Sequence, residues 1–459
     1  MKTATIPATS LREGQQRLKP NFYLNAGKLR LDKMRHNGHP MSTIGEQSAA
    51  VYRSDIFKRQ FVKDPKFGVP YISGADMMKA APLESSRLVS AKFTPNMEET
   101  SLKTNQILIT CAGSVGNVRL ITADLEGVIG SQDIIRVDYD ERKLPYGFLY
   151  AYLASPTVYD YMQSLYYGSV IPRIEPFHVR QIPVPRLPAA QMQQIHAAIE
   201  AAARLREEAT RLLAEAKQRI MDELKLDKLL SQPLAKHKSV PLSAIRKSYT
   251  MRLEASAFAG FSGAMVRHFE SQGIKCRLLG EVSRRIFRPG IFKRVFVKDG
   301  IPFLGGGEMM QTNPKPEKQL SRTQTDNQDK LMLNKYWTLI TCGGTIGNNI
   351  FTNEGHIGMA ASQHVIRVVA GDEVQSGFLY AYLSSSVGSA FLQEYSYGSV
   401  IPQIEPHHIA NIPVPQLSPE VQEAIHEQVI QASDKQYQAN QLEDQAIHTV
   451  ETAISAWQK

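Results

Sequence analysis

The stretch Gly147-Phe148-Leu149-Tyr150-Ala151-Tyr152-Leu153 occurs twice in this sequence, because Gly377–Leu383 repeats it without a change. Other blocks return in the same order on both sides of it. They are Ile56-Phe57-Lys58-Arg59 at 291–294, Ile109-Thr110-Cys111 at 340–342, the block 167–176 at 397–406, and Ile182-Pro183-Val184-Pro185 at 412–415. The spacing falls only from about 235 to about 230 residues, so two homologous halves are present rather than a solenoid of short repeats.

Each half has the pattern of a mixed α/β (α+β) domain. Short apolar runs broken by Gly, Pro and Asn, such as 106–110 and 133–137, predict strands with tight turns. Apolar residues at helical spacing over Gly147–Ser164 and Gly377–Gln393 predict helices.

A long helix is expected after each globular part. Residues 189–230 contain no Gly or Pro and carry an apolar seam from Ile195 to Leu224, while Ser418-Pro419 opens a second seam that reaches Trp457. Neither helix can bury its seam alone, so we expect the two to pair, the alternative being that each packs only on its own globular part. The predicted boundaries are 1–188 and 249–418 for the domains, 189–230 and 419–459 for the helices, and 231–248 for a linker.

Composition and charge limit the function. The formal charge of +9 and the pI near 9.2 fit a polyanionic partner such as nucleic acid. Three scattered cysteines suit neither a disulfide framework nor a zinc site, and no apolar run approaches the ~20 residues of a membrane span. We therefore expect a soluble, cytoplasmic protein.

The repeated blocks resemble the target-recognition domains of type I restriction-modification specificity (S) subunits. The carrying features are Ile-Thr-Cys-x-Gly-Ser/Thr-x-Gly from Ile109 and Ile340, Tyr-Gly-Ser-Val-Ile-Pro from Tyr167 and Tyr397, Ile-Pro-Val-Pro, and the helix that follows at once. The resemblance covers nearly the whole chain, twice and in the family's order.

This resemblance implies two target-recognition domains separated by two long antiparallel coiled-coil helices, with an internal pseudo-twofold repeat. Each domain would read half of a bipartite double-stranded DNA target, and the helices would set the unread gap. The implied partners are methyltransferase (M) subunits, two by expectation, and a restriction (R) motor subunit that can join them. No cofactor is implied in this chain, since S-adenosylmethionine and ATP belong to the partner subunits.

The glycine-containing blocks have two interpretations. The segments 109–117 and 340–348 could present backbone N–H groups to a phosphate, or form a tight turn that needs positive φ. We favour the turn because both copies lack the lysine of a nucleotide-binding loop. Cys111 and Cys342 occupy matching positions, and a small core thiol is the expected role.

Candidate DNA contacts fall into a shared and a divergent class. The basic, aromatic segments 56–64 and 291–299 suit either phosphate contact or a structural hairpin. Arg173 matches Gln403, and since Arg pairs best with guanine and Gln with adenine, this difference either discriminates bases or is surface drift. Other divergent zones are 83–103 against 317–333 and 282–289 against 47–55. The candidate set is Lys58, Arg59, Lys63, Ser169, Arg173, Arg284, Arg285, Lys293, Arg294, Lys298, Ser399 and Gln403.

Several chemistries have no support in the sequence. Five histidines, His178, His196, His407, His408 and His426, lack a carboxylate or cysteine cluster at metal spacing, so surface or capping roles are expected. No methyltransferase, nucleotide-binding or nuclease motif is found. The prediction is therefore a non-catalytic specificity subunit. The alternatives are the recognition subunit of a methyltransferase-only or fused nuclease-methyltransferase system, and a stand-alone DNA-binding regulator.

Overall fold

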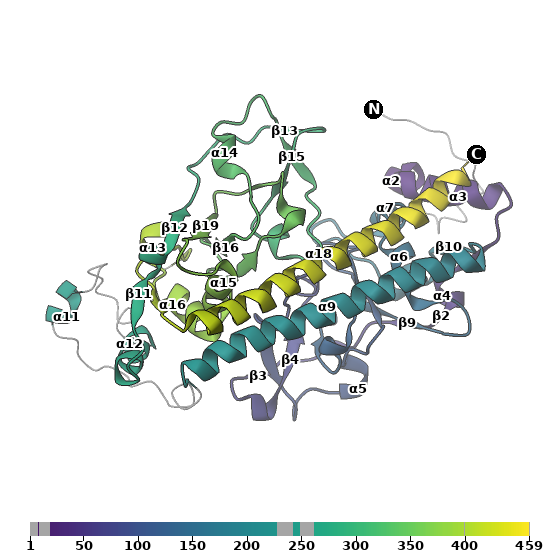
Figure 1. The fold of residues 1–459 in the computed structure, drawn as a ribbon. Helices are drawn as coiled ribbons and strands as arrows, with labels where there is room; N and C mark the ends of the chain where they lie inside the picture. The colour runs from purple at the N-terminus through teal and green to yellow at the C-terminus, as the bar shows by residue number, and fades with distance from the viewer. Residues whose placement is uncertain (1–7, 9–18, 227–241, 248–260, 399, 459) are drawn as a thin grey trace. The chain divides into compact units, whose positions relative to one another are not determined.

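The computed structural model describes residues 8, 19–226, 242–247, 261–398 and 400–458. It divides into two compact units, shown by the ribbon in Figure 1. The first unit comprises Met1–Glu207 and Gln438–Lys459, and the second comprises Glu208–Tyr437. Each unit therefore contains one globular repeat together with part of both long helices.

Two four-stranded sheets organise the first unit. One has the antiparallel order β2 (Ser48–Tyr52), β9 (Ile134–Tyr139), β6 (Ile107–Thr110), β7 (Val118–Leu120). The other has the order β3 (Phe61–Val62), β5 (Arg87–Ser90), β4 (Gly68–Ile72), β8 (Ile129–Gly130), with β4 and β8 parallel. A separate pair joins β1 (Met41–Thr43) to β10 (Pro183–Pro185).

The residues of the central strand β6 do not alternate between apolar and polar, because both faces of this strand are buried. Its residues Ile107 and Ile109 face the main core, whereas Leu108 faces a smaller core on the opposite side of the sheet. A strand covered on both faces carries apolar side chains at successive positions, so the run predicted as a strand is confirmed as a buried one.

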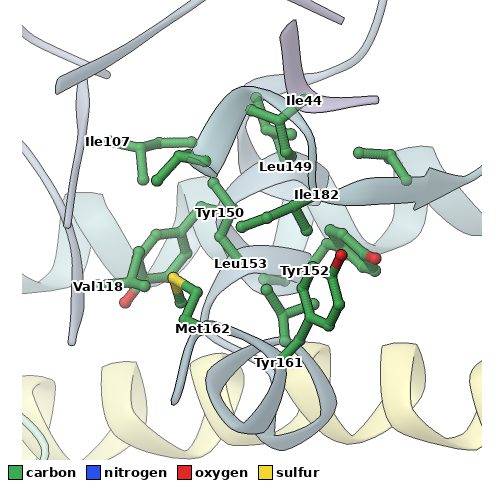
Figure 2. Close-up of a cluster of buried hydrophobic side chains, with 14 of the residues drawn as sticks. Ile44, Ile107, Val118, Leu149, Tyr150, Tyr152, Leu153, Tyr161, Met162 and Ile182 are labelled. Atoms are coloured by element: carbon green, nitrogen blue, oxygen red, sulfur yellow. The ribbon is translucent and has the colours of Figure 1, made fainter. Parts of the chain in front are cut away.

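The main core lies between this sheet and a helical layer. The layer consists of α2 (Pro20–Leu24), α3 (Ala26–His36), α4 (Ile44–Gln47), α6 (Tyr146–Leu153), α7 (Pro156–Leu165) and α8 (Pro176–Arg180), while α5 (Met97–Thr100) lies by the second sheet. Every residue of the duplicated stretch from Gly147 to Leu153 is buried, and Figure 2 shows Leu149, Tyr150 and Leu153 at the centre of the cluster.

The helical stretch predicted over Gly147–Ser164 is divided into two helices. The first helix ends at Leu153 with Ala154 as its C-cap. Ser155 caps the second helix, its Oγ accepting a hydrogen bond from the backbone N–H of Val158 at 3.4 Å, and Pro156 occupies the first turn as capped helices favour. Ser385 has the same role in the second copy without a proline.

The second unit repeats this topology strand for strand. One sheet has the order β12 (Ser283–Phe287), β19 (Val365–Ala370), β16 (Thr338–Thr341), β17 (Asn349–Phe351), and the other β13 (Phe296–Val297), β15 (Lys318–Leu320), β14 (Ile301–Leu304), β18 (Ala360–Ala361). A strand pair joins β11 (Cys276–Leu278) to β20 (Pro413–Pro415). The helices are α11 (Leu242–Lys247), α12 (Phe261–Ser271), α13 (Leu279–Val282), α14 (Gln328–Leu331), α15 (Ser376–Ser384), α16 (Ser386–Glu394) and α17 (Pro406–Ile409). The predicted duplication is confirmed.

One arginine ties the two sheets together in each unit. Arg136 is fully buried and donates hydrogen bonds to the carbonyl oxygens of Gly130, in β8, at 2.9 Å and of Thr100 at 3.2 Å. Arg367 makes the matching bond to Ala361 at 2.7 Å. Burial lowers the pKa of Arg367 to about 10, and carbonyl acceptors around the guanidinium compensate for the lost water.

The long helices are α9 (Ala189–Glu223) and α18 (Pro419–Ala456). In the first unit, Arg206 of α9 contacts Glu443, while Ile195, earlier in α9, shares a core with Val450 and Ile454, later in α18. The two segments therefore run in opposite directions.

The second unit contains the other ends of the same helices. Glu208 binds Lys435 at 2.5 Å, and Ile220 shares a core with Ile425. The segments are again antiparallel, which confirms the pairing prediction over packing on one globular part alone. Helix α9 ends at Glu223, and the predicted linker 231–248 lies outside the described residues except for α11.

Candidate nucleic-acid interface

Several loops meet at one end of the β2-β9-β6-β7 sheet. The registers pair Tyr52 with Arg136 and Thr110 with Ile134, so the ends of β2 and β6 lie beside the beginning of β9. The segment 167–174 joins them, because Arg173 bridges to Ala112. We call this the loop end. It comprises 53–60, 111–117, 131–133 and 167–174 in the first unit, and 288–295, 342–348, 362–364, 397–398 and 400–404 in the second.

The glycine-containing blocks form tight turns at the loop end. Gly113 and Gly116 have φ of +74° and +93°, and Gly344 and Gly347 have φ of +77° and +85°, a region that favours glycine. The N–H groups of Gly113 and Gly116 are already bonded to the carbonyl oxygens of Pro172 and Thr110. The structure therefore supports the turn, since these donors are not free for a phosphate.

The next loop carries an exposed tip. Tyr167 and Arg173 exchange two backbone hydrogen bonds of 2.9 and 2.8 Å, which close the segment between them. Gly168 has φ +90°, and a Cβ there would lie 2.5 Å from the carbonyl oxygen of Ile171. Val170 is 90% exposed at the tip, and the candidate Ser169 lies beside it. The matching candidate Ser399 lies outside the described residues.

Charged groups surround Arg173. Its Nη1 lies 3.8 Å from Oδ1 of Asp133, and both side chains are more than a third exposed. Arg53 pairs with Glu175 at 3.6 Å, and the Tyr167 hydroxyl also donates to Glu175. The guanidinium of Arg173 is thus accessible and held at the loop end, as a base contact requires.

The second unit has a different polar group at the same place. Gln403 accepts a hydrogen bond from the Tyr397 hydroxyl at 3.4 Å, and Arg288 pairs with Glu405 at 2.8 Å. His364 occupies the position of Asp133 and lies 3.3 Å from the Gln363 amide. The divergent pair Arg173 and Gln403 therefore lies on equivalent scaffolds.

The basic segment after β2 is anchored by one phenylalanine. Phe57 is buried, while Lys58 and Lys63 are exposed, as are Lys293 and Lys298 in the other copy. Arg59 donates a hydrogen bond to the Tyr71 hydroxyl at 2.9 Å. Arg294 instead binds Oε1 of Gln363 at 2.7 Å. Lys58, Arg59, Lys293 and Arg294 belong to the loop end, whereas Lys63 and Lys298 follow β3 and β13.

Two candidates lie elsewhere. Arg284 and Arg285 are near the beginning of β12, which pairs with the end of β19. Arg284 pairs with Asp372, and the Arg285 guanidinium lies 3.9 Å from the ring centroid of Phe287. They are at the opposite end of the sheet from the loop end. Their neighbour Arg288 reaches it instead.

The two cysteines at matching positions are core thiols. Cys111 and Cys342 are each 1% exposed. Burial and the neighbouring Asp133 raise the pKa of the Cys111 thiol to about 11. The thiol is therefore protonated at neutral pH and unsuited to nucleophilic attack.

The capping role expected for the histidines is found at four of them. Nδ1 of His196 and of His426 accepts the N–H of Gly147 and Gly377 at 3.3 and 3.1 Å, at the starts of α6 and α15. His178 and His408 accept the N–H of Glu175 and Glu405 in the same way. Burial lowers the pKa of His196 and His426, which favours the neutral acceptor. Across the described residues no group of His, Cys, Asp and Glu could hold a metal ion.

Comparison with known proteins decides the family. A family model described as the type I restriction modification DNA specificity domain matches residues 51–200 and 290–447. The chain belongs to this family. Each of the two matched segments of this specificity subunit begins within one globular repeat and continues into the long helix that follows it.

Solved structures give further likenesses to this specificity subunit. The S subunit of a type I restriction-modification system from M. genitalium has 16% identity, 92% coverage of this chain, 95% of that chain and a TM-score of 0.31. The HsdS subunit from Thermoanaerobacter tengcongensis has 16% identity, coverages of 91% and 96%, and a TM-score of 0.29. Curated proteins gave no match. Over the described part of the chain, no helix has the length and apolarity to cross a bilayer.

Proposed function

We propose that the chain is the DNA-sequence-specificity subunit of a type I restriction-modification system that recognises a bipartite double-stranded target. Each loop end would meet one half-site, mainly in the major groove, where all base pairs are distinguishable. The observation that carries the proposal is the pair of loop ends, built on identical strand orders but differing at Arg173 and Gln403. A shared backbone scaffold whose side chains differ between the two copies suits two different half-sites.

The shared basic residues would bind the DNA backbone. Lys58 and Lys293 are exposed at matching positions in a chain of net charge +9, and phosphate contacts position a protein without reading sequence. Arg59, Arg294, Lys63 and Lys298 would contribute in the same way. Ser169 and Ser399 remain candidates beside the base-reading positions. The location of Arg284 and Arg285 away from the loop end favours a phosphate contact over base reading for them.

The chemistry would come from partner subunits. We infer that the chain is non-catalytic, that methyltransferase subunits carry S-adenosylmethionine, and that ATP belongs to a restriction subunit where one joins. Two methyltransferase subunits suit two repeats, and the cytoplasm is the compartment in which such a complex meets DNA. The buried, protonated thiols of Cys111 and Cys342 agree with a binding role.

The decisive experiment is to purify the chain with its methyltransferase subunit and to sequence the bases that the complex methylates. We expect a stable complex and one motif made of two half-sites with an unread gap. A chain that forms no complex and directs no methylation contradicts the proposal. Methylation of a single uninterrupted site contradicts the bipartite part alone.

A further inference from the structure

Another divergent position of the loop end contacts Arg173. Across 131–133 and 167–176, the two copies differ only where Asp133 is replaced by His364 and Arg173 by Gln403. These segments lie far apart in the sequence, yet the two variable side chains are the ones that meet, with Arg173 Nη1 3.8 Å from Asp133 Oδ1.

The backbone around these positions is the same in both units. The N–H of Cys111 donates to the carbonyl oxygen of Asp133 at 3.2 Å, and the Cys111 carbonyl accepts from Ile174 at 3.0 Å. In the second unit, Cys342 makes the equivalent bonds with His364 and Ile404, both at 3.1 Å. The two variable positions therefore flank one buried cysteine, and the backbone hydrogen bonds that hold them are the same in both units.

Stability does not explain the ion pair. The side chains of Arg173 and Asp133 are 40% and 35% exposed, and an exposed pair contributes little to folding. Both groups can therefore be turned to a ligand at small cost. Arginine donates to O6 and N7 of guanine, and aspartate accepts from the N4 amino group of cytosine. Together they complement both bases of a G·C pair.

In the second unit, the side chains at the same two positions complement an A·T base pair. Glutamine binds N6 and N7 of adenine, and an imidazole N–H can donate to O4 of thymine. The His364 ring is held 3.3 Å from Gln363, whose Oε1 accepts from Arg294 at 2.7 Å. In the first unit Arg59, which matches Arg294, is bonded to the Tyr71 hydroxyl instead. The second unit has Phe303 at the position of Tyr71 and so offers no hydroxyl to Arg294.

We propose that Asp133 and Arg173 act together to read a G·C base pair, and that His364 and Gln403 read an A·T base pair at the corresponding position of the other half-site. This inference rests on the proposed function. It adds Asp133 and His364 as specificity-determining residues that were not found from the sequence.

The test exchanges the pairs in the full chain within the methyltransferase complex, with sequencing of methylated bases as the readout. Asp133→His/Arg173→Gln should change one position of the first half-site from G·C to A·T, reversing its preference by about 10-fold or more. The second half-site should not change. His364→Asp/Gln403→Arg should make the reciprocal change.

A matched control is the ion pair of Asp140 and Arg142, which follows the far end of β9 with Nε and Oδ1 3.2 Å apart. Asp140→Asn/Arg142→Gln should leave the motif as it is. An unchanged motif in the exchange variants, or a change in both half-sites, overturns the inference. A wild-type complex that modifies no motif refutes the proposed function itself.

If an exchange variant folds but directs no methylation, the single variant Asp133→Asn tests the inference instead. This change keeps the side chain's shape but replaces one acceptor oxygen with a donor. Weaker selection for cytosine at that position, with thermal unfolding unchanged, supports the inference. Undiminished selection for cytosine overturns it.

Discussion

Replacing Glu443 by leucine should destabilise the first unit selectively. Oε2 of Glu443 lies 2.6 Å from Arg206 Nη1 and accepts from the Tyr150 hydroxyl at 3.0 Å. The side chains of Arg206 and Glu443 are only 18% and 9% exposed. Burial opposes the charge of Arg206, but Glu443 and Tyr150 outweigh it and raise the pKa of Arg206.

The magnitude follows from which groups lose a partner. Glu443→Leu leaves the buried Arg206 guanidinium and the Tyr150 hydroxyl without this acceptor. A second cation lies nearby, because burial and then the charge of Arg206 lower the pKa of Arg119 to about 10. Removing one member of a buried ion pair costs about 3–5 kcal/mol. We therefore expect the free energy of unfolding of the first unit to fall by about 4 kcal/mol.

The second unit supplies a matched control. At the positions of Arg206 and Glu443 the repeat has Gln436 and Leu213, and Leu213 packs against the core that contains Tyr380. Arg206→Gln/Glu443→Leu reproduces that pair and removes the uncompensated charge. The double variant should stay within about 2 kcal/mol of the wild-type protein.

The assay can separate the units because the chain has two tryptophans. Trp457 belongs to the first unit and stacks on His39 with ring centroids 4.3 Å apart, whereas Trp337 belongs to the second unit. Urea unfolding is followed by fluorescence in variants that keep one tryptophan and replace the other by phenylalanine. The reasoning is refuted by a loss below about 1 kcal/mol for Glu443→Leu, by an equal loss in the double variant, or by an equal shift of the Trp337 transition.

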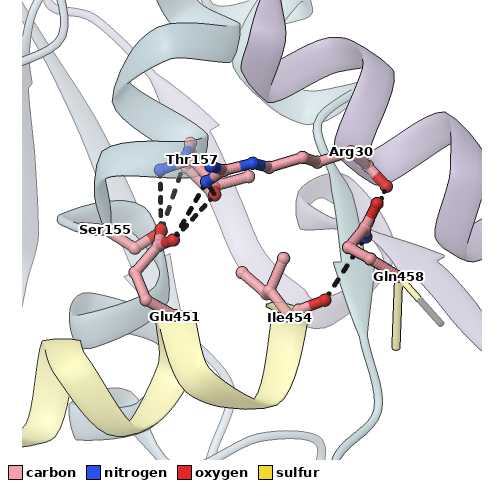
Figure 3. A network of polar contacts seen from close by, with 7 residues as sticks. Arg30, Ser155, Thr157, Glu451, Ile454 and Gln458 are labelled. Carbon is pink, nitrogen blue, oxygen red and sulfur yellow. Dashed lines mark hydrogen bonds and ion pairs between the residues drawn. The ribbon is translucent and has the colours of Figure 1, made fainter. Parts of the chain in front are cut away.

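Three further predictions follow from single contacts. Glu451→Gln should lower the free energy of unfolding of the first unit by about 1–2 kcal/mol in urea titrations, because the Glu451 carboxylate accepts hydrogen bonds from the Thr157 N–H and hydroxyl at 2.7 and 2.9 Å (Figure 3). An unchanged free energy of unfolding contradicts this capping role. Burial lowers the pKa of His356 from 6.5 to about 4. The neutral His356 therefore contributes fully to the stability of the second unit above pH 6.5, and about 3 kcal/mol of its free energy of unfolding is lost as the pH falls to about 4. Unfolding titrations across this range should show a smaller loss for His356→Leu, which copies Leu125 of the first unit. An equal loss in the variant contradicts the prediction. Lys58→Ala should reduce the slope of log affinity against log salt by about 1 and leave the methylated motif unchanged, as measured by fluorescence anisotropy and methylation sequencing; an altered motif would make Lys58 a base contact.

Much of the fold follows from the repeat. Comparison of the two copies locates both domains and both long helices, and the glycines at 113 and 116 predict turns that the structure shows with positive φ. The helix break at Ala154 and Ser155 was not predicted, because the apolar spacing continues through it. A serine and proline together gave a usable signal there, since this pair favours the start of a new helix.

The loop end was harder to predict. Arg173 was found because its counterpart differs in a block that is otherwise the same, and Asp133 carries the same signal beside Ser131-Gln132. Nothing local shows that Asp133 and Arg173 meet, since β9, two helices and a loop separate them in the chain. Arg284 was placed with the candidates because it is a basic residue in the divergent zone 282–289, and strand register puts it at the other end of β12 from the loop end.

The division of the chain into units has a consequence for its synthesis. The second unit is one continuous segment, Glu208–Tyr437, whereas the first needs both Met1–Glu207 and Gln438–Lys459. The ribosome makes residues in chain order, so the first unit lacks Glu443 and Glu451 until nearly the whole chain has been made. The first globular repeat must therefore wait for the last segment of the chain, and until that segment packs it exposes the apolar surface that Val450 and Ile454 will cover.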